Sequence, residues 1–166
     1  MIRGTRKRVA SFFLFNIMAS IQEHYNKVKP LLDEAYITTQ LFNYIRSIEK
    51  ELVLLNKNQI ELDSEDIFGK PIGFYSAKTE AITKGKKKTG QPFTGKDTGN
   101  WLAEFRLVPV PDGFQFWSSD EKTATILSSP DWLSHNLFGL TDENLNLSIK
   151  KYFLQFFINY FRNALL

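Results

Sequence analysis

The chain has 166 residues, of which 43% are hydrophobic and 23% are charged, a composition that fits one ordinary globular domain. The lack of cysteine in the sequence excludes disulfides, thiolate metal sites and thiol catalysis, and the two histidines, His24 and His135, lie too far apart in the chain to indicate a histidine-rich metal site. The net charge of +3 is too small to indicate a nucleic-acid-binding protein by itself. We therefore expect no cofactor and no metal.

Residues 1–29 begin with a basic cluster and continue into an apolar run. The cluster consists of Arg3, Arg6, Lys7 and Arg8. A basic cluster followed by an apolar run is similar to a secretory signal, but here the apolar run is short and Asn16 interrupts it. We interpret residues 1–29 as a basic arm leading into an amphipathic segment, and we expect no membrane partner because no stretch reaches the roughly 18–20 apolar residues of a span.

Residues 30–166 are expected to form a single α+β domain that starts with a long helix. Apolar side chains recur at three- and four-residue spacing from Leu31 to Leu55, which predicts a helix with one buried stripe. Pro30 suits the first turn of that helix. One or two helical turns are predicted over residues 76–83, and residues 84–100 form a basic, glycine-rich loop.

The hydrophobic period then changes to two, which predicts a β-hairpin. Phe105 and Leu107 alternate with more polar residues on the first arm, and Phe114 and Phe116 do so on the second. Between the arms, residues 111–113 (Pro-Asp-Gly) supply the chemistry of a tight turn. An antiparallel hairpin of this size must pack against helices, so we expect it to lie on the long first helix and on a second one near the carboxy terminus.

The last helix is predicted to start after Thr141, a natural N-cap, and to run to about residue 166. Between residues 152 and 161 nearly every side of it is apolar or aromatic, and such a helix must be covered all round. A neighbouring subunit could supply the cover, or the helix could cross the centre of a monomer. The candidate oligomer interface consists of Tyr152, Phe153, Phe156, Phe157, Tyr160 and Phe161.

Basic residues gather in two places that could contact DNA or an acidic partner. These residues are Arg6, Lys7 and Arg8 in the amino-terminal arm and Lys84, Lys86, Lys87 and Lys88 in the loop. The alternative is a solvated charge run that keeps an aromatic-rich protein in solution.

Two short motifs match the residue patterns of catalytic sites, but the residues around them do not fit those sites. Residues 90–96 match the first part of a phosphate-binding loop, but Asp97 stands where a Ser or Thr must hold magnesium. The tripeptide Asp97-Thr98-Gly99 occurs in aspartic proteases, where it follows an apolar strand, whereas here Lys96 precedes it. A hydrolase stays open as an alternative, and we favour a protein that is not an enzyme.

Four segments taken together resemble a known family. They are Gln91-Pro-Phe-Thr, the stretch from Lys96 to Phe105 with its Asp-Thr-Gly-Asn-Trp, Ser118-Ser-Asp-Glu-Lys-Thr, and Phe138-Gly-Leu-Thr-Asp-Glu-Asn-Leu. Their order resembles a family of virion structural proteins found in tailed phages of Bacteroidetes, including crAss-like phages. More loosely, the Asp-Thr-Gly segment is similar to tail-completion and head–tail joining proteins.

The resemblance implies a homo-oligomeric ring in the neck or upper tail of a virion, assembled in the host cytoplasm. Its partners would be itself, portal, connector or tail proteins, and packaged DNA through non-specific contacts. The resemblance also implies structural roles for motif residues: Asp97, Thr98 and Gly99 form a turn, Trp101 and Phe105 begin a strand, Gly139 ends a turn and Thr141 caps a helix. A nucleic-acid-binding module that uses the loop and the arm is the alternative.

Overall fold

The structure is a computed structural model that describes residues 21–96, 100–111, 113–128 and 135–165. It divides the chain into two compact units, the first formed by Met1–Tyr44 with Leu154–Leu166 and the second by Ile45–Phe153. Neither boundary coincides with the one expected between residues 29 and 30. The fold is α+β, as the sequence predicts, with a two-stranded antiparallel sheet and a long carboxy-terminal helical segment.

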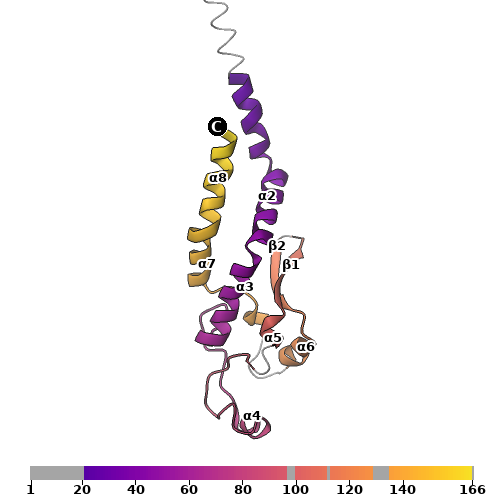
Figure 1. Ribbon diagram of the computed structural model, residues 1–166, viewed down its shortest axis with the longest axis vertical. Coiled ribbons are helices and arrows are strands. Elements are labelled where there is room, and N and C mark those ends of the chain that lie inside the picture. Colours follow the sequence, from indigo (N-terminus) through magenta and orange to yellow (C-terminus); the bar gives the residue numbers. More distant parts are fainter. Residues whose placement is uncertain (1–20, 97–99, 112, 129–134, 166) are drawn as a thin grey trace, which may run out of the picture. The chain divides into compact units, whose positions relative to one another are not determined.

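The elements follow one another along the chain as Figure 1 shows. After a helical segment at residues 21–28 they are η1 (Lys29–Leu32), α2 (Glu34–Ser47), α3 (Glu49–Asn58), η2 (Gln59–Asp63), α4 (Ala77–Ile82), α5 (Asn100–Ala103), β1 (Phe105–Val110), β2 (Gly113–Ser118), α6 (Lys122–Leu127), η3 (His135–Leu137), α7 (Asp142–Ser148), η4 (Ile149–Phe153) and α8 (Leu154–Leu165). Both η2 and η4 are π-helical turns that continue the α-helix before them.

The predicted first helix is interrupted twice, and its residues fall in η1, α2 and α3. Asp33 lies outside helical structure, and its carboxylate accepts a hydrogen bond of 2.9 Å from the amide of Tyr36, which caps the start of α2. A second break separates α2 from α3, where the amide of Ile48 bonds the carbonyl of Ile45 at 3.2 Å. The apolar spacing from Leu31 to Leu55 is therefore shared between the two units, because Tyr44 ends one and Ile45 begins the other.

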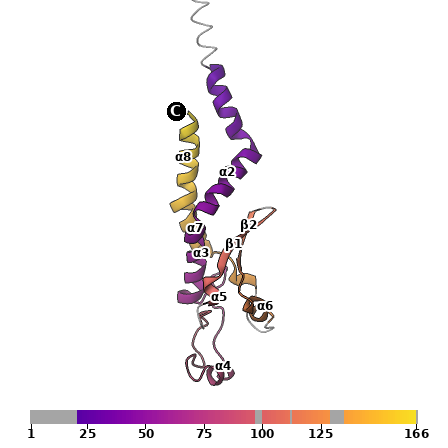
Figure 2. The same ribbon diagram turned by 45° about the vertical axis from the view of Figure 1, so that its right-hand side comes forward.

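The core of the second unit lies where the hairpin meets α3. β1 and β2 pair in one register from Phe105 opposite Ser118 to Val110 opposite Gly113, which confirms the predicted hairpin; Asp112 of its turn lies outside the described residues. The buried cluster consists of Val53, Ile60, Ile72, Tyr75, Phe93, Trp101, Leu102, Phe105 and Leu137. Figures 1 and 2 show the hairpin beside α3 and the α4 segment projecting from the rest of this unit.

Two buried amide side chains join α3 and η2 to the segment before α7. Asn56 is fully buried, and its Nδ2 donates to the carbonyl oxygens of Leu137 at 2.9 Å and Gly139 at 2.6 Å. Gln59 is 1% exposed, and its Oε1 accepts hydrogen bonds from the amide of Thr141 at 2.8 Å and from Nδ2 of Asn144 at 3.2 Å. We call Asn56 and Gln59 the amide clamp. It satisfies backbone groups that would otherwise be buried without partners.

Thr141 caps α7 as the sequence predicts, because its hydroxyl accepts a hydrogen bond of 3.3 Å from the amide of Asn144. Gly139 lets the backbone lie close to the side chain of Ile67, because a Cβ atom at this position would lie 2.8 Å from Cγ2 of Ile67. The amide of Ile67 also donates to the carbonyl of Asn136 at 2.9 Å. The segment from Asn136 to Thr141 is thus held from two sides.

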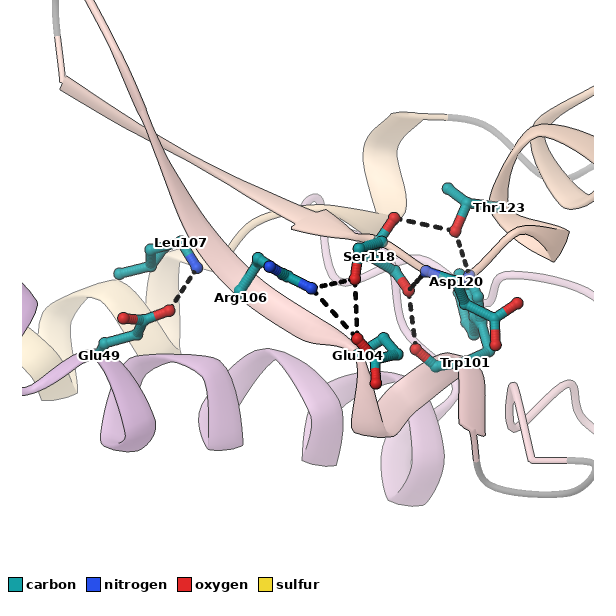
Figure 3. A network of polar contacts seen from close by, with 9 residues as sticks. Glu49, Trp101, Glu104, Arg106, Leu107, Ser118, Asp120 and Thr123 are labelled. Atoms are coloured by element: carbon teal, nitrogen blue, oxygen red, sulfur yellow. Dashed lines mark hydrogen bonds and ion pairs between the residues drawn. The ribbon is translucent and has the colours of Figure 1, made fainter.

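A second polar network fastens the end of the hairpin (Figure 3). The indole of Trp101 donates to Oγ1 of Thr123 at 3.1 Å, and Ser118 Oγ donates to the carbonyl of Trp101 at 2.9 Å. Thr123 Oγ1 in turn donates to the carbonyl of Ser118 at 3.0 Å. The expectation that Trp101 begins a strand is wrong, because Trp101 lies in the short helix α5 and only Phe105 begins β1. This helix places the indole nitrogen of Trp101 beside Thr123 and the indole ring against Phe105.

The edge of β1 is also occupied. The amide of Leu107 donates to Oε1 of Glu49 on α3 at 3.0 Å (Figure 3). Glu104, Arg106 and Ser119 bond one another at the surface nearby. A carboxylate that accepts from an outward strand amide removes one of the groups with which another strand could pair.

We expect Gln59→Ala to lower the free energy of unfolding by about 2–4 kcal/mol, because it leaves the amide of Thr141 without its acceptor and opens a cavity. Chemical denaturation measures this loss. The control is Gln155→Ala, which removes an exposed glutamine that donates to Oδ1 of Asn159 at 3.0 Å. It should change stability by less than about 0.5 kcal/mol. Equal effects of the two substitutions would contradict a structural role for the amide clamp.

A pair of glycines tests the packing around Trp101. Gly90 (φ +82°) and Gly95 (φ +64°) both have left-handed backbone, but a Cβ at Gly95 would lie 2.9 Å from Cζ3 of Trp101, whereas a Cβ at Gly90 would meet nothing within 4 Å. Gly90→Ala should therefore cost only the backbone strain of about 1–2 kcal/mol. Gly95→Ala should cost a further ~1–3 kcal/mol for the collision. Equal unfolding midpoints for the two variants would refute the close approach.

Candidate functional site

One face of α8 packs against α2 within the first unit. The ring of Phe156 stacks on Tyr44 with a centroid distance of 4.7 Å, and Tyr160 lies 6.4 Å from Tyr36. These two contacts make α2 and α8 an antiparallel pair joined by aromatic side chains, and Figure 1 shows the two helices side by side. Such ring pairs contribute about 0.5–1.5 kcal/mol each beyond the area they bury.

The other face of α8 is apolar and open. Leu154 is 53% exposed, Ile158 40% and Phe161 41%, and they follow one another at spacings of four and three residues. We call these three side chains the outer stripe. Among the described residues of the first unit, only Leu31 is buried. The helix pair therefore has little core of its own, and its exposed apolar side chains are of the kind that a further helix or subunit covers.

The expected interface residues divide between these faces. Phe156 and Tyr160 meet α2, Phe157 packs on Phe156 at 5.1 Å, and of the six only Phe161 belongs to the outer stripe. Tyr152 and Phe153 lie in η4 and are half-buried. The candidate interface named from the sequence contains only aromatic residues and omits Leu154 and Ile158. The spacing of residues 154, 158 and 161, which places them on one helical face, could have revealed both.

The Tyr160 hydroxyl is buried between the helices of the first unit and has no hydrogen-bond partner among the described residues. Desolvation raises the pKa of Tyr160 above its ordinary value, and Tyr36 and Asp33 add to the shift.

The basic loop is closed by hydrogen bonds and is not a loose run of charges. Oε2 of Glu80 accepts from both the amide of Thr89 at 2.9 Å and its hydroxyl at 2.5 Å. The amide of Lys87 donates to Oγ1 of Thr83 at 3.2 Å, and the amide of Lys88 donates to Oε1 of Gln91 at 3.0 Å. These contacts hold the backbone from residue 80 to residue 91 in one arrangement.

A cavity of about 450 Å³ lies beside this loop in the second unit. It is lined by Leu62, Asp63, Ser64, Tyr75, Lys86, Lys87, Gln91, Pro92, Thr94 and Lys96. Among the described residues of the lining are three lysines and one aspartate. We call it the lysine cavity. Of the four predicted contact lysines in the loop, Lys86 and Lys87 line it and Lys84 and Lys88 do not.

Several predicted site residues lie outside the described residues. These are Arg6, Lys7 and Arg8 of the arm and Asp97, Thr98 and Gly99 of the turn. Lys96, at the lysine position of the phosphate-loop pattern, forms an ion pair of 2.5 Å with Glu61. The next described helix after residues 90–96 is α5, which begins at Asn100 and has four residues.

The pKa of Glu80 is lowered from its ordinary value, first by the Thr89 hydroxyl, then by the Thr89 amide, with a smaller effect of Lys88. A lowered folded-state pKa means that this contact is intact above the ordinary carboxyl pKa and is lost as the pH falls through the lowered value. We expect the Thr89 amide resonance to titrate with Glu80 in that acidic range. In Thr89→Val the pKa of Glu80 should rise, and a Glu80 pKa at or above the ordinary value in the parent would contradict the closed loop.

No described helix is long and apolar enough to cross a membrane, and the described residues contain no group of three or more His, Cys, Asp or Glu side chains placed to hold a metal ion. Comparison with known proteins finds no matching family model, no matching curated protein and no matching solved structure. The two features of the chain's own geometry that bear on its function are the outer stripe of α8 and the lysine cavity.

Proposed function

We propose that this chain is a non-enzymatic structural protein that assembles with copies of itself into a ring, as a neck or upper-tail component of a tailed-phage virion. The observation that supports assembly is the outer stripe on α8, which leaves three large apolar side chains in solvent beside a helix pair with little core. A second copy is the occupant we favour, because α8 has apolar residues on both faces, one packed on α2 and the other open as the outer stripe.

The aromatic contacts of α8 supply the rigidity that an assembly surface requires. Because Phe156 and Tyr160 are held by Tyr44 and Tyr36, the stripe on the opposite side of α8 has a defined orientation on its helix. Ordering such a surface before association reduces the entropy lost on binding. Arg162 is the only charged residue between residues 154 and 165, so α8 itself carries little charge that would oppose the association of two copies.

The four segments that resemble virion structural proteins support a structural role in this chain. Thr123, in the Ser118–Thr123 segment, holds the indole of Trp101, and the segment from Phe138 to Thr141 is bonded by the amide clamp. Gly95, beside Trp101, is required for close packing. Residues that are engaged in this way maintain the fold, and none of these contacts sets up a nucleophile with a base.

The virion location rests on the resemblance of those segments, and the assembly rests on α8. An imaging experiment separates the two: particles of the purified protein viewed by negative-stain electron microscopy should be closed rings. Open filaments or amorphous aggregates would contradict ring formation while leaving the α8 contact intact.

We expect the parent protein to sediment as an oligomer at micromolar concentration and moderate salt. Ile158→Glu should weaken association at least about tenfold, because it places a charge in the centre of the stripe that association would bury. Analytical ultracentrifugation measures the association, and far-ultraviolet circular dichroism checks that the helices remain. Asn159→Glu is the control, since it adds the same charge to the neighbouring exposed, polar position of α8.

Sedimentation of the parent as a sharp monomer peak would overturn the proposal. So would an Ile158→Glu protein that associates as strongly as the parent. If Asn159→Glu dissociates the oligomer as well as Ile158→Glu does, the contact surface is not confined to the outer stripe, which contradicts its assignment.

A further inference from the structure

We propose that the outer stripe of α8 in one copy packs into an apolar groove beside α3 in the next copy. This contact rests on the proposed ring and supplies the surface that receives the stripe. A ring of more than two copies related by one rotation needs two different contact surfaces on each chain, because a contact between identical surfaces closes after two copies. The stripe is one of these surfaces, so the other lies elsewhere on the chain.

The groove lies in the second unit and has a volume of about 480 Å³. Helix α3 contributes Val53 and Leu54 to its lining, and the segment from α5 to β1 contributes Ala103 and Phe105. Val53 and Phe105 belong to the buried core cluster, whereas Leu54 is 54% exposed. The core therefore fixes the base of the groove, and Leu54 leaves an apolar side chain in solvent at its edge.

The outer stripe fits this groove in spacing and in polarity. Leu154, Ile158 and Phe161 follow the i, i+4, i+7 spacing with which a helix places its apolar side chains in a groove. Four of the seven lining residues of the groove are apolar, whereas the lysine cavity has three such residues, Tyr75 included, among ten. The groove is thus the better match of the two for three large apolar side chains.

The stripe brings no charge to the lysines at the groove. Lys50 and Lys57 line it, seven residues apart along α3, and residues 154–161 of α8 carry no charged side chain. The aliphatic part of each lysine can extend along the incoming apolar side chains while its ammonium group stays in water. Insertion of the stripe therefore does not require an ion to be buried.

The charges at the helix ends favour an antiparallel arrangement of the two helices. Arg162 lies in the last turn of α8, directly after the stripe, and the first turn of α3 contains Glu49 and Glu51. In this orientation the guanidinium of Arg162 approaches these carboxylates, and the negative end of the α8 dipole approaches Lys50. The parallel arrangement would instead place Arg162 at the end of α3 that carries Lys57.

The test measures the association of full-length variants by analytical ultracentrifugation over a series of concentrations. Leu54→Glu should weaken association at least about tenfold, because it places a charge where the stripe would be buried. Ala103→Glu, which changes the other side of the groove, should act in the same way. Leu62→Glu is the matched control, since Leu62 is an exposed leucine of the second unit outside the groove; it should alter association about threefold or less.

A mixture of two defective variants tests whether the stripe and the groove are the two sides of one contact. Leu54→Glu protein keeps an intact stripe, and Ile158→Glu protein keeps an intact groove. Together they should form a complex of one copy of each that grows no further, because the two surfaces left over are both disrupted. Circular dichroism and thermal unfolding check that each variant keeps its fold.

Two results would overturn this contact. If the Leu54→Glu and Ala103→Glu proteins associate as strongly as the parent, the stripe meets another surface, such as the stripe of a second copy. If the mixture sediments as the sum of its separate components, the stripe and the groove do not complement each other. Both results can occur while Ile158→Glu still dissociates the oligomer, which leaves the assembly proposal standing, whereas a monomeric parent refutes that proposal itself.

Discussion

The amide clamp is the interaction on which the second unit depends. Asn56 and Gln59 lie on consecutive helical turns, and between them they bond the carbonyls of Leu137 and Gly139 and the amide of Thr141. That segment enters α7, and Leu137 and Phe138 contribute to the packing around Trp101 and Phe105. Two buried side-chain amides therefore fix a chain segment that is some eighty residues away in sequence and leave the aromatic core to fill the space around it.

Much of this fold follows from local patterns in the sequence. The alternation of Phe105 and Leu107 with polar residues, followed by a Pro-Asp-Gly turn, is sufficient to predict the hairpin, and Thr141 is sufficient to predict the start of α7. The position of Trp101 could not be predicted in the same way. In its short helix the indole nitrogen reaches Thr123, a contact across 22 residues of sequence that no spacing along the chain reveals.

The candidate sites were only partly visible in the sequence for a related reason. A run of lysines is obvious, but the cavity beside it also uses Ser64 and Tyr75, which chain connectivity places far from the run. The amphipathic pattern of α8 likewise shows that apolar residues surround the helix without showing which of them α2 covers. Periodicity identifies a face, and only the tertiary contacts show whether that face remains open.

The base of the α4 segment has a consequence for how this protein can vary. The amide of Gly90 donates to the carbonyl of Tyr75 at 2.9 Å, and the amide of Tyr75 donates to the carbonyl of Gln91 at 2.9 Å, so residues 76–89 leave and re-enter the fold at adjacent points. A segment joined in this way is a cassette: it can be lengthened, shortened or exchanged for a tight turn while the chain on either side keeps its course. The charge beside the lysine cavity can consequently change in evolution independently of the residues that hold the core together.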